Sequence, residues 1–285
     1  MNLDLDTLIK SLEEAPLATS IIALNKARVA LASLNDPNSV TVETIEKELI
    51  KISPELYAFI FKQAKIKETE NIQEGLDEAI ATLGFNRVKK LIYFHIAFSG
   101  ELDEDSTDLD RLFAARLWSL NYAIASTAEF WVSRLHPSLA EEAFFLGMFQ
   151  NIGISAFAQL QPSRHRALRE SNRKIPLHQK EEEHYGFNHY DLAIALTQSW
   201  ALPTTHIAAL RYEISHGQII PISIGENHED LLQILYYSKF RCENKKQSKG
   251  AKELKYGIDP YFEYDNTLLQ IVAERIAELK PKKAS

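Results

Sequence analysis

The chain has 285 residues, of which 45% are hydrophobic and 25% are charged, a composition typical of globular proteins that bury a core. Its formal net charge of −7 argues against a protein that binds nucleic acid or membrane surfaces through its overall charge. The one cysteine, Cys242, cannot form an intrachain disulfide, so we expect a reducing compartment.

The first residues of the sequence do not have the pattern of a secretion signal. The first 20 residues are acidic and amphipathic, and they lack the basic start and apolar centre of a signal peptide. No apolar stretch reaches the roughly 18 residues that would suggest a membrane span. We therefore expect a cytoplasmic protein that does not bind membranes.

The N-terminal part of the chain predicts a helical lobe over residues 1–100. Turn-forming residues at 35–38 are followed by a helix expected from Thr41. Ser53 and Pro54 are typical of a helix N-cap and first helical residue. Gly84 is a candidate for the C-cap of a further helix.

Charged segments divide the rest of the chain. The acidic run ELDEDSTDLD, residues 101–110, is interpreted as a solvated linker, with a docking site for a basic partner as the alternative. A second helical lobe is expected over residues 111–241. Residues 242–285 are expected to form a lysine-rich loop and a helix, at about 265–280, that packs back on a lobe.

The second lobe has strong helical periodicity. Apolar residues recur every three or four positions from Phe113 to Leu135, and His136 before Pro137 ends this helix. Aromatic residues of such segments are expected in the core: Trp118, Trp131, Trp200, Tyr236, Tyr237 and Phe240. Because sustained period-two alternation is almost absent, the predicted fold is all-α with two helical lobes.

The apolar segment FFLGMFQNIGISAFAQL, residues 144–160, has two adjacent carboxamides in its middle. Gln150 and Asn151 are followed by Gly153. Buried polar groups cost free energy unless they are paired, so these amides need partners or a function.

Several segments, taken in order, resemble the HDOD family, the HD-related output domain of bacterial signalling proteins. Those of the first lobe are ALASLNDPNSVTVETIEKELIKISPELYAFIFKQA and DEAIATLGFNRVKKLIYF. Those of the second are RLWSLNYAIASTAEFWVSRL, AEEAFFLGMFQNIG and EEEHYGFNHYDLAIALTQSWALPTTHIAALRYE. The resemblance covers about residues 12–240, and it implies that the second lobe is a degenerate HD-type helical bundle.

The resemblance also implies what the pocket has lost. HD phosphohydrolases hold divalent metal through an adjacent His-Asp pair, further histidines and a distal aspartate, and the metal activates water for attack on a phosphoester. Gln150 and Asn151 stand at the position of that pair. The remaining ligand positions correspond to Leu120, to Glu213 and Ile214, and to Ser238. Two neutral amides make a poor metal site, so neither a metal, a cofactor nor a catalytic residue is expected.

Two interpretations of this relic pocket stay open. The amides either satisfy each other and nearby backbone, or they bind a small ligand such as a nucleotide. Further candidates for contacts with a ligand or partner are His189, Arg211, Arg166 and Arg169, the last two from a basic stretch at residues 164–174. A metal site from His189, His206, His216 and either Asp191 or Glu213 is a weaker alternative, because His189 is better interpreted as a capping or packing residue.

The sequence therefore favours a non-catalytic signalling or regulatory module, acting in trans, that binds a protein partner or a small ligand. The first alternative is a metal-dependent phosphohydrolase that acts on nucleotides or cyclic dinucleotides, and the absent His-Asp pair argues against it. The second is a regulator that binds nucleic acid through a basic stretch, which the net charge of −7 disfavours. The sequence has no Gly-rich phosphate loop and no nucleophile elbow.

Overall fold

The structure, a computed structural model, describes residues 54–66, 71–84, 107–200, 202–215 and 227–243, with a few isolated positions besides. Within these residues 85% are helical and none lies in a strand, so the all-α prediction is confirmed. The chain divides into two compact units. The smaller is Asp6–Glu101 with Ser199–Leu202, and the larger is mainly Leu102–Gln198 and Pro203–Ser285.

Several predicted features lie outside the described residues. These are the turn at 35–38, the helix from Thr41, the N-cap Ser53, the lysine-rich loop and the helix at 265–280.

The smaller unit contributes α4 (Pro54–Ala64) and α5 (Ile72–Leu83), which pack on each other. Helix α4 begins at Pro54, as predicted, because proline has no N–H to lose at the first helical position. The C-cap of α5 is Gly84, also as predicted, and its φ of 81° favours glycine. The buried side chains of these helices include Leu56, Ile60, Leu76 and Ala79.

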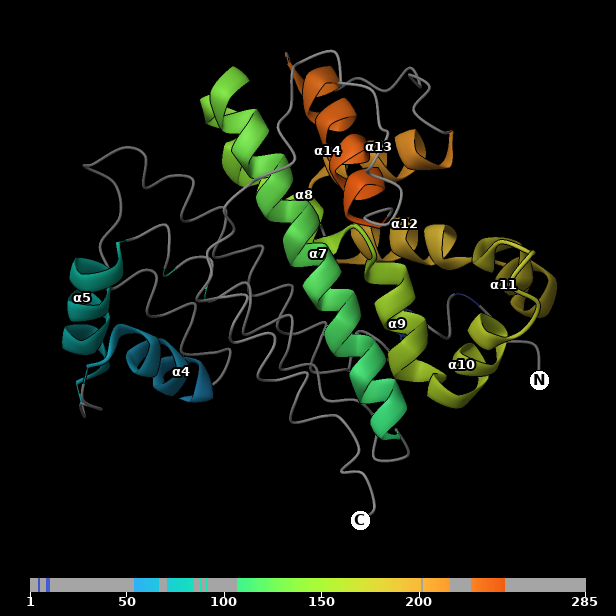
Figure 1. Ribbon diagram of the computed structural model, residues 1–285, viewed down its shortest axis with the longest axis horizontal. Helices are drawn as coiled ribbons and strands as arrows, with labels where there is room; N and C mark the ends of the chain where they lie inside the picture. The colour runs from blue at the N-terminus through green and yellow to red at the C-terminus, as the bar shows by residue number, and fades with distance from the viewer. Residues whose placement is uncertain are drawn as a thin grey trace. The chain divides into compact units, whose positions relative to one another are not determined.

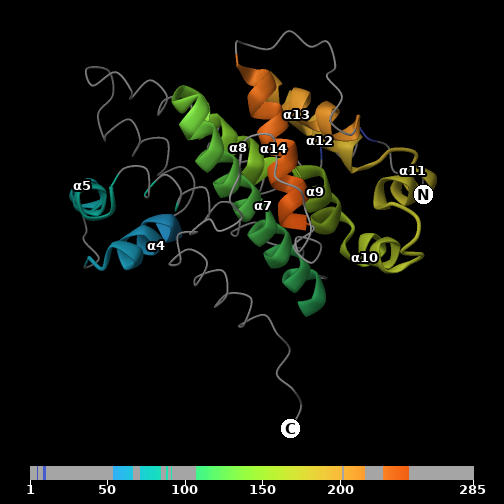
Figure 2. The same cartoon turned by 45° about the horizontal axis from the view of Figure 1, so that its top comes forward.

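The larger unit is a helical bundle (Figures 1 and 2). Its elements are α7 (Asp108–Leu135), η2 (Pro137–Leu139), α8 (Ala140–Phe149), α9 (Ile152–Leu160), α10 (Pro162–Glu170), α11 (Leu177–Tyr185), α12 (His189–Ser199), α13 (Thr204–Ile214) and α14 (His228–Glu243). The long helix α7 packs against α8, α9, α10 and α14, and α13 packs on α14. The bundle thus surrounds the junction between α8 and α9, where the two amides lie.

Helix α7 begins with a capping box. The Thr107 hydroxyl accepts a hydrogen bond from the Asp110 N–H, and the Asp110 carboxylate accepts one from the Thr107 N–H. Asp110 is only 2% exposed and pairs with Arg166 of α10 at 2.6 Å. The prediction of a solvated linker throughout residues 101–110 is therefore wrong at its C-terminal end. The Thr-x-x-Asp pattern starts the helix there.

Helices α7 and α8 cross at very short range. A Cβ atom added to Gly147 would lie 2.4 Å from the Cα of Ala125, so this crossing requires glycine. Beside it, Trp118 of α7 packs edge-on against Phe149 of α8, with ring centroids 6.2 Å apart. The contact fixes the end of α8, directly before the amides.

The aromatic residues divide between core and surface. Trp118 and Trp200 are buried, as predicted. Tyr237 and Phe240 are 40% and 50% exposed, so their prediction as core residues is wrong. They lie on the outer face of α14, whose opposite face is buried through Leu231, Leu235, Ser238 and Cys242.

One described stretch, Pro137–Leu160, is long and apolar enough to cross a membrane, although no such stretch was expected from the sequence. In its most apolar window, 89% is buried inside the protein. A core helix of a soluble protein passes the same test, so the burial accounts for the apolar character.

Candidate functional site

The two amides form the turn between α8 and α9, and both are buried. The turn is held from α13, where the ring of His206 donates a hydrogen bond from Nε2 to the carbonyl oxygen of Phe149 at 3.1 Å. Burial lowers the pKa of His206 to about 4, so the ring is neutral at pH 7. His206 therefore provides a hydrogen bond to the last carbonyl group of α8 without placing a charge in the core.

Gly153 explains how the turn fits beneath α12. A Cβ atom at this position would lie 1.9 Å from the backbone carbonyl oxygen of His189, the first residue of α12. Only glycine permits this approach. The close crossing brings the start of α12 to the start of α9.

Gln150 contacts the carboxylate of Glu213, which the resemblance predicted at one of the former ligand positions. Its Nε2 donates a hydrogen bond to Oε2 of Glu213, on α13, at 2.8 Å. The hydroxyl of Tyr190, on α12, donates to Oε1 of the same carboxylate, also at 2.8 Å. Glu213 is therefore held from the α8–α9 turn and from α12.

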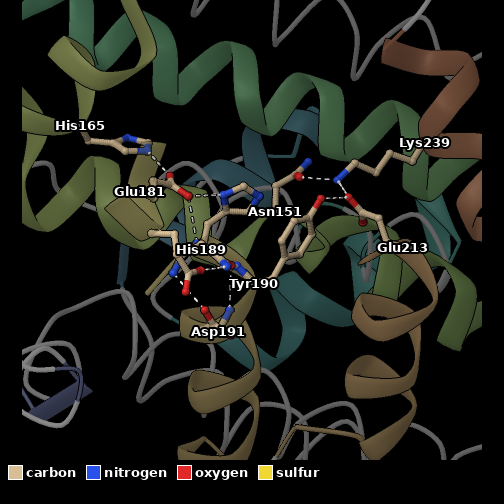
Figure 3. Close-up of polar contacts among 10 residues, drawn as sticks. Asn151, His165, Glu181, His189, Tyr190, Asp191, Glu213 and Lys239 are labelled. Atoms are coloured by element: carbon tan, nitrogen blue, oxygen red, sulfur yellow. Dashed lines mark hydrogen bonds and ion pairs between the residues drawn. The ribbon is translucent and has the colours of Figure 1, made fainter. Parts of the chain in front are cut away.

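Asn151 lies at the centre of the arrangement (Figure 3). Its Nδ2 donates to Oδ1 of Asn121, on α7, at 2.7 Å. Its own Oδ1 accepts a hydrogen bond from the Lys239 ammonium, on α14, at 2.9 Å, and this ammonium lies 2.5 Å from Oε1 of Glu213. We call this group the Lys239 cluster; its members are Asn121, Gln150, Asn151, Tyr190, Glu213 and Lys239.

The cluster keeps Glu213 ionised although the carboxylate is buried. Burial alone would raise the pKa of Glu213, but the charge of Lys239 and hydrogen bonds from Lys239, Tyr190 and Gln150 lower it instead. The pKa of Tyr190 is raised, first by burial and then by the negative charge of Glu213. At pH 7 the cluster therefore contains one anion and one cation.

A second buried network lies beside the cluster. Glu181 of α11 accepts a hydrogen bond from His165 Nε2 at 2.9 Å and another from His189 Nδ1 at 2.5 Å. Burial would raise the pKa of Glu181, but these two hydrogen bonds outweigh it and lower the pKa to about 2. The carboxylate thereby fixes the orientation of the His189 ring at the start of α12.

Residues 24–215 match the model of the HDOD domain, which is more than half of the chain. The chain belongs to the HDOD family. The resemblance predicted from the sequence is thereby confirmed. No curated protein matches the chain.

Three solved structures share the fold of this HDOD protein. A "Putative phosphohydrolase" from Shewanella amazonensis SB2B is 18% identical, with a TM-score of 0.58 over 96% of this chain and 92% of its own. An HDOD domain protein of unknown function from Geobacter sulfurreducens is 17% identical, with a TM-score of 0.54 over 95% and 88%. A "Putative signal transduction protein" from Marinobacter aquaeolei VT8 is 18% identical, with a TM-score of 0.52 over 90% and 55%. Because the sequence identities are this low, the three similarities show a shared fold and do not show a shared function.

The Lys239 cluster lacks the set of ligands that holds a metal ion in HD enzymes. Among the described residues no group of three or more His, Cys, Asp and Glu side chains could bind a metal ion. Within the cluster Glu213 is the one carboxylate, and it is already paired with Lys239. Of the alternative histidine set, His206 is bonded to Phe149 and Thr197, and His216 lies outside the described residues.

The structure also places the other candidate positions. Leu120 is half-buried, while its neighbour Asn121 belongs to the cluster. The Ser238 hydroxyl donates to the carbonyl of Ile234, while its neighbour Lys239 reaches Asn151. Sequence reasoning missed both Asn121 and Lys239. Both are buried, but α7 and α14 carry several other polar residues, so the sequence of these helices did not single them out as it did the two amides. Ile214 is exposed and lies outside the cluster.

The three candidate arginines do not converge on one site. Arg166 pairs with Asp110 and Thr107 at the start of α7. The Arg169 guanidinium lies 3.3 Å from the centroid of the Phe113 ring. Arg211 is exposed on α13. Arg166 and Arg169 thus attach α10 to α7.

Proposed function

We propose that this HDOD protein is a non-catalytic signalling module of the bacterial cytoplasm, which binds a protein partner or a small ligand at the Lys239 cluster or beside it. The observation that carries the proposal is that both amides, predicted from the resemblance to stand at the His-Asp position, are hydrogen-bonded within the protein. Gln150 bonds to Glu213, while Asn151 bonds to Asn121 and Lys239.

The electrostatics of the cluster support a non-catalytic role. Phosphoester hydrolysis by HD enzymes depends on a divalent metal that lowers the pKa of bound water. A metal ion at this position would lie beside the Lys239 ammonium, which already neutralises Glu213. Repulsion between like charges at a few ångströms disfavours such binding.

Family membership supports the signalling part of the proposal. The HDOD fold fits a signalling role, and the related structure from Marinobacter aquaeolei carries the name of a signal transduction protein. Because one fold can serve many functions, the non-catalytic role and the binding must be argued from the residues of the site.

His189 is the residue through which a ligand or partner could be contacted. Glu181 holds its Nδ1 and its backbone N–H, whereas its Nε2 has no hydrogen-bond partner among the described residues. Because Nδ1 donates its proton to Glu181, Nε2 of the neutral ring is an acceptor, which suits a hydrogen bond from a hydroxyl, an amino group or a backbone N–H. A nucleotide is the small ligand that we would test first.

Metal content and hydrolysis test the non-catalytic part. The purified protein is incubated with Mn²⁺, Fe²⁺, Ni²⁺ or Mg²⁺, dialysed and analysed for metal per chain, and then assayed with nucleotides and cyclic dinucleotides. We expect neither stoichiometric metal nor turnover. Stoichiometric metal with turnover that is lost in Glu213→Ala would establish the phosphohydrolase instead.

Binding tests the rest of the proposal. Partners captured from a bacterial extract, and nucleotides measured by calorimetry, are compared between the wild type, His189→Ala and His184→Ala. His184 is an exposed histidine of α11 and serves as the matched control. We expect binding to be weakened by His189→Ala and unchanged by His184→Ala. Binding that is equal in all three proteins would exclude His189 as the contact.

A further inference from the structure

Lys239 has an unusual environment for a lysine. It is 8% exposed, and among the described residues every polar contact of its Nζ is with an oxygen atom. These atoms are Oδ1 of Asn151 at 2.9 Å, Oε1 of Glu213 at 2.5 Å and, more distantly, Oε1 of Glu243 at 3.8 Å. Lysine is rarely buried unless it is paired.

The ammonium links helices that are distant in sequence. Asn151 comes from the α8–α9 turn and Glu213 from α13, whereas Lys239 comes from α14. Asn121 of α7 holds Asn151, and Tyr190 of α12 holds Glu213. One positive charge therefore organises five segments of the bundle, as a bound metal ion does in a metalloprotein.

The oxygen atoms of the cluster are suited to a hard cation. Carboxylate and amide oxygens are the ligands that Ca²⁺ and Mg²⁺ prefer. In addition, Oε1 of Gln150 is buried and accepts no hydrogen bond within the described part of the chain. Its amide nitrogen is bonded to Glu213, so the unused acceptor belongs to the carboxamide next to the charged pair.

We propose that the Lys239 ammonium is a tethered cation that takes the place of a metal ion, so that removal of this side chain leaves an oxygen-lined site for Ca²⁺. The Lys239 side chain then supplies the positive charge that holds the helices together, and the fold does not require a bound metal ion. This replacement does not require the proposed signalling function.

Thermal unfolding of Lys239→Ala, with and without millimolar Ca²⁺, tests the replacement. Loss of the ammonium leaves Glu213 buried without its counter-charge, so we expect Tm to fall by about 10 °C without Ca²⁺. Added Ca²⁺ is expected to raise Tm saturably in Lys239→Ala but not in the wild type. Tb³⁺, bound in place of Ca²⁺, is expected to show luminescence sensitised by Tyr190.

Two controls isolate the site. Lys180 is another buried lysine, but its Nζ bonds to the carbonyl of Leu168. Lys180→Ala is therefore expected to show no response to Ca²⁺. Lys239→Ala/Glu213→Gln lacks the carboxylate and is also expected to show none. A folded Lys239→Ala protein without any Ca²⁺ or Tb³⁺ response would overturn the proposal.

A second set of variants decides the matter if Lys239→Ala does not fold. Lys239→Met, Glu213→Gln and the double variant form a thermodynamic cycle. If the ammonium acts as the counter-cation of Glu213, the double variant recovers most of the Tm that Lys239→Met loses. If the two losses simply add, the proposal is wrong. Wild-type hydrolysis of phosphoesters would overturn the proposed function, whereas the Ca²⁺ response of Lys239→Ala is measured independently of it.

Discussion

His165 Nε2 lies 2.9 Å from Oε1 of Glu181, and both side chains are fully buried. Because the pKa of His165 is lowered, chiefly by burial, the ring is neutral and donates to an ionised carboxylate. The other carboxylate oxygen accepts from His189. Glu181 thus joins α10, α11 and α12 through a single negative charge.

Glu181→Gln is expected to destabilise the protein at pH 7 by about 3 kcal/mol, since a buried charged acceptor is lost. The folded pKa of about 2 lies below the ordinary value of 4.5, so this contribution is complete above pH 4.5 and is lost as the pH falls toward 2. Urea unfolding over this range measures it. The exposed neighbour Glu183 provides the control Glu183→Gln, and equal effects of the two substitutions would contradict the prediction.

Because His206 is buried as a neutral ring, we expect the protein to lose stability in a second pH range, above that of Glu181. Its folded pKa of about 4 lies below the ordinary value of 6.5, so between these values the unfolded chain binds the additional proton. Stability is therefore lost as the pH falls from 6.5 to 4, by about 3 kcal/mol. Replacement by glutamine, which has no titrating proton, should remove this component. An unchanged pH profile in His206→Gln would show that another group is responsible.

The fold was largely predictable because its signals are local. The apolar spacing of α7, its end at His136 and the C-cap Gly84 depend on neighbours within a few residues, and the structure bears them out. Tyr237 and Phe240 were misplaced because an aromatic residue in a helix can lie on either face, and the buried face is decided by tertiary packing.

The cluster was less predictable because its partners are distant in the chain. Gln150 and Glu213 are separated by 63 positions and Asn151 and Lys239 by 88. Sequence alone identified the two amides as groups that needed partners. Only the packing of α7 and α14 against α8 brings Asn121 and Lys239 to them.

Gly153→Ala is expected to destabilise the larger unit by about 3 kcal/mol or more. The new methyl group would lie 1.9 Å from the His189 carbonyl oxygen, which is backbone and cannot rotate away. The half-buried neighbour offers the control Ile154→Val, for which a loss of about 1 kcal/mol is expected. Chemical denaturation of both variants makes the comparison. A loss for Gly153→Ala no larger than that of the control would mean that α9 and α12 do not cross this closely.

Asp110 and Arg166 are expected to be coupled, because the capping box of α7 and the ion pair to α10 share one carboxylate. Asp110→Ala removes both and should cost about 3 kcal/mol, whereas Arg166→Ala leaves the cap and should cost less. Thr107→Ala removes the cap hydroxyl but keeps the Asp110–Arg166 pair, and about 1 kcal/mol is expected. Urea unfolding of the two single variants and the double variant Asp110→Ala/Arg166→Ala gives the coupling energy. Strictly additive losses would show that the pair contributes nothing to the attachment of α10, and that capping alone explains why Asp110 is buried.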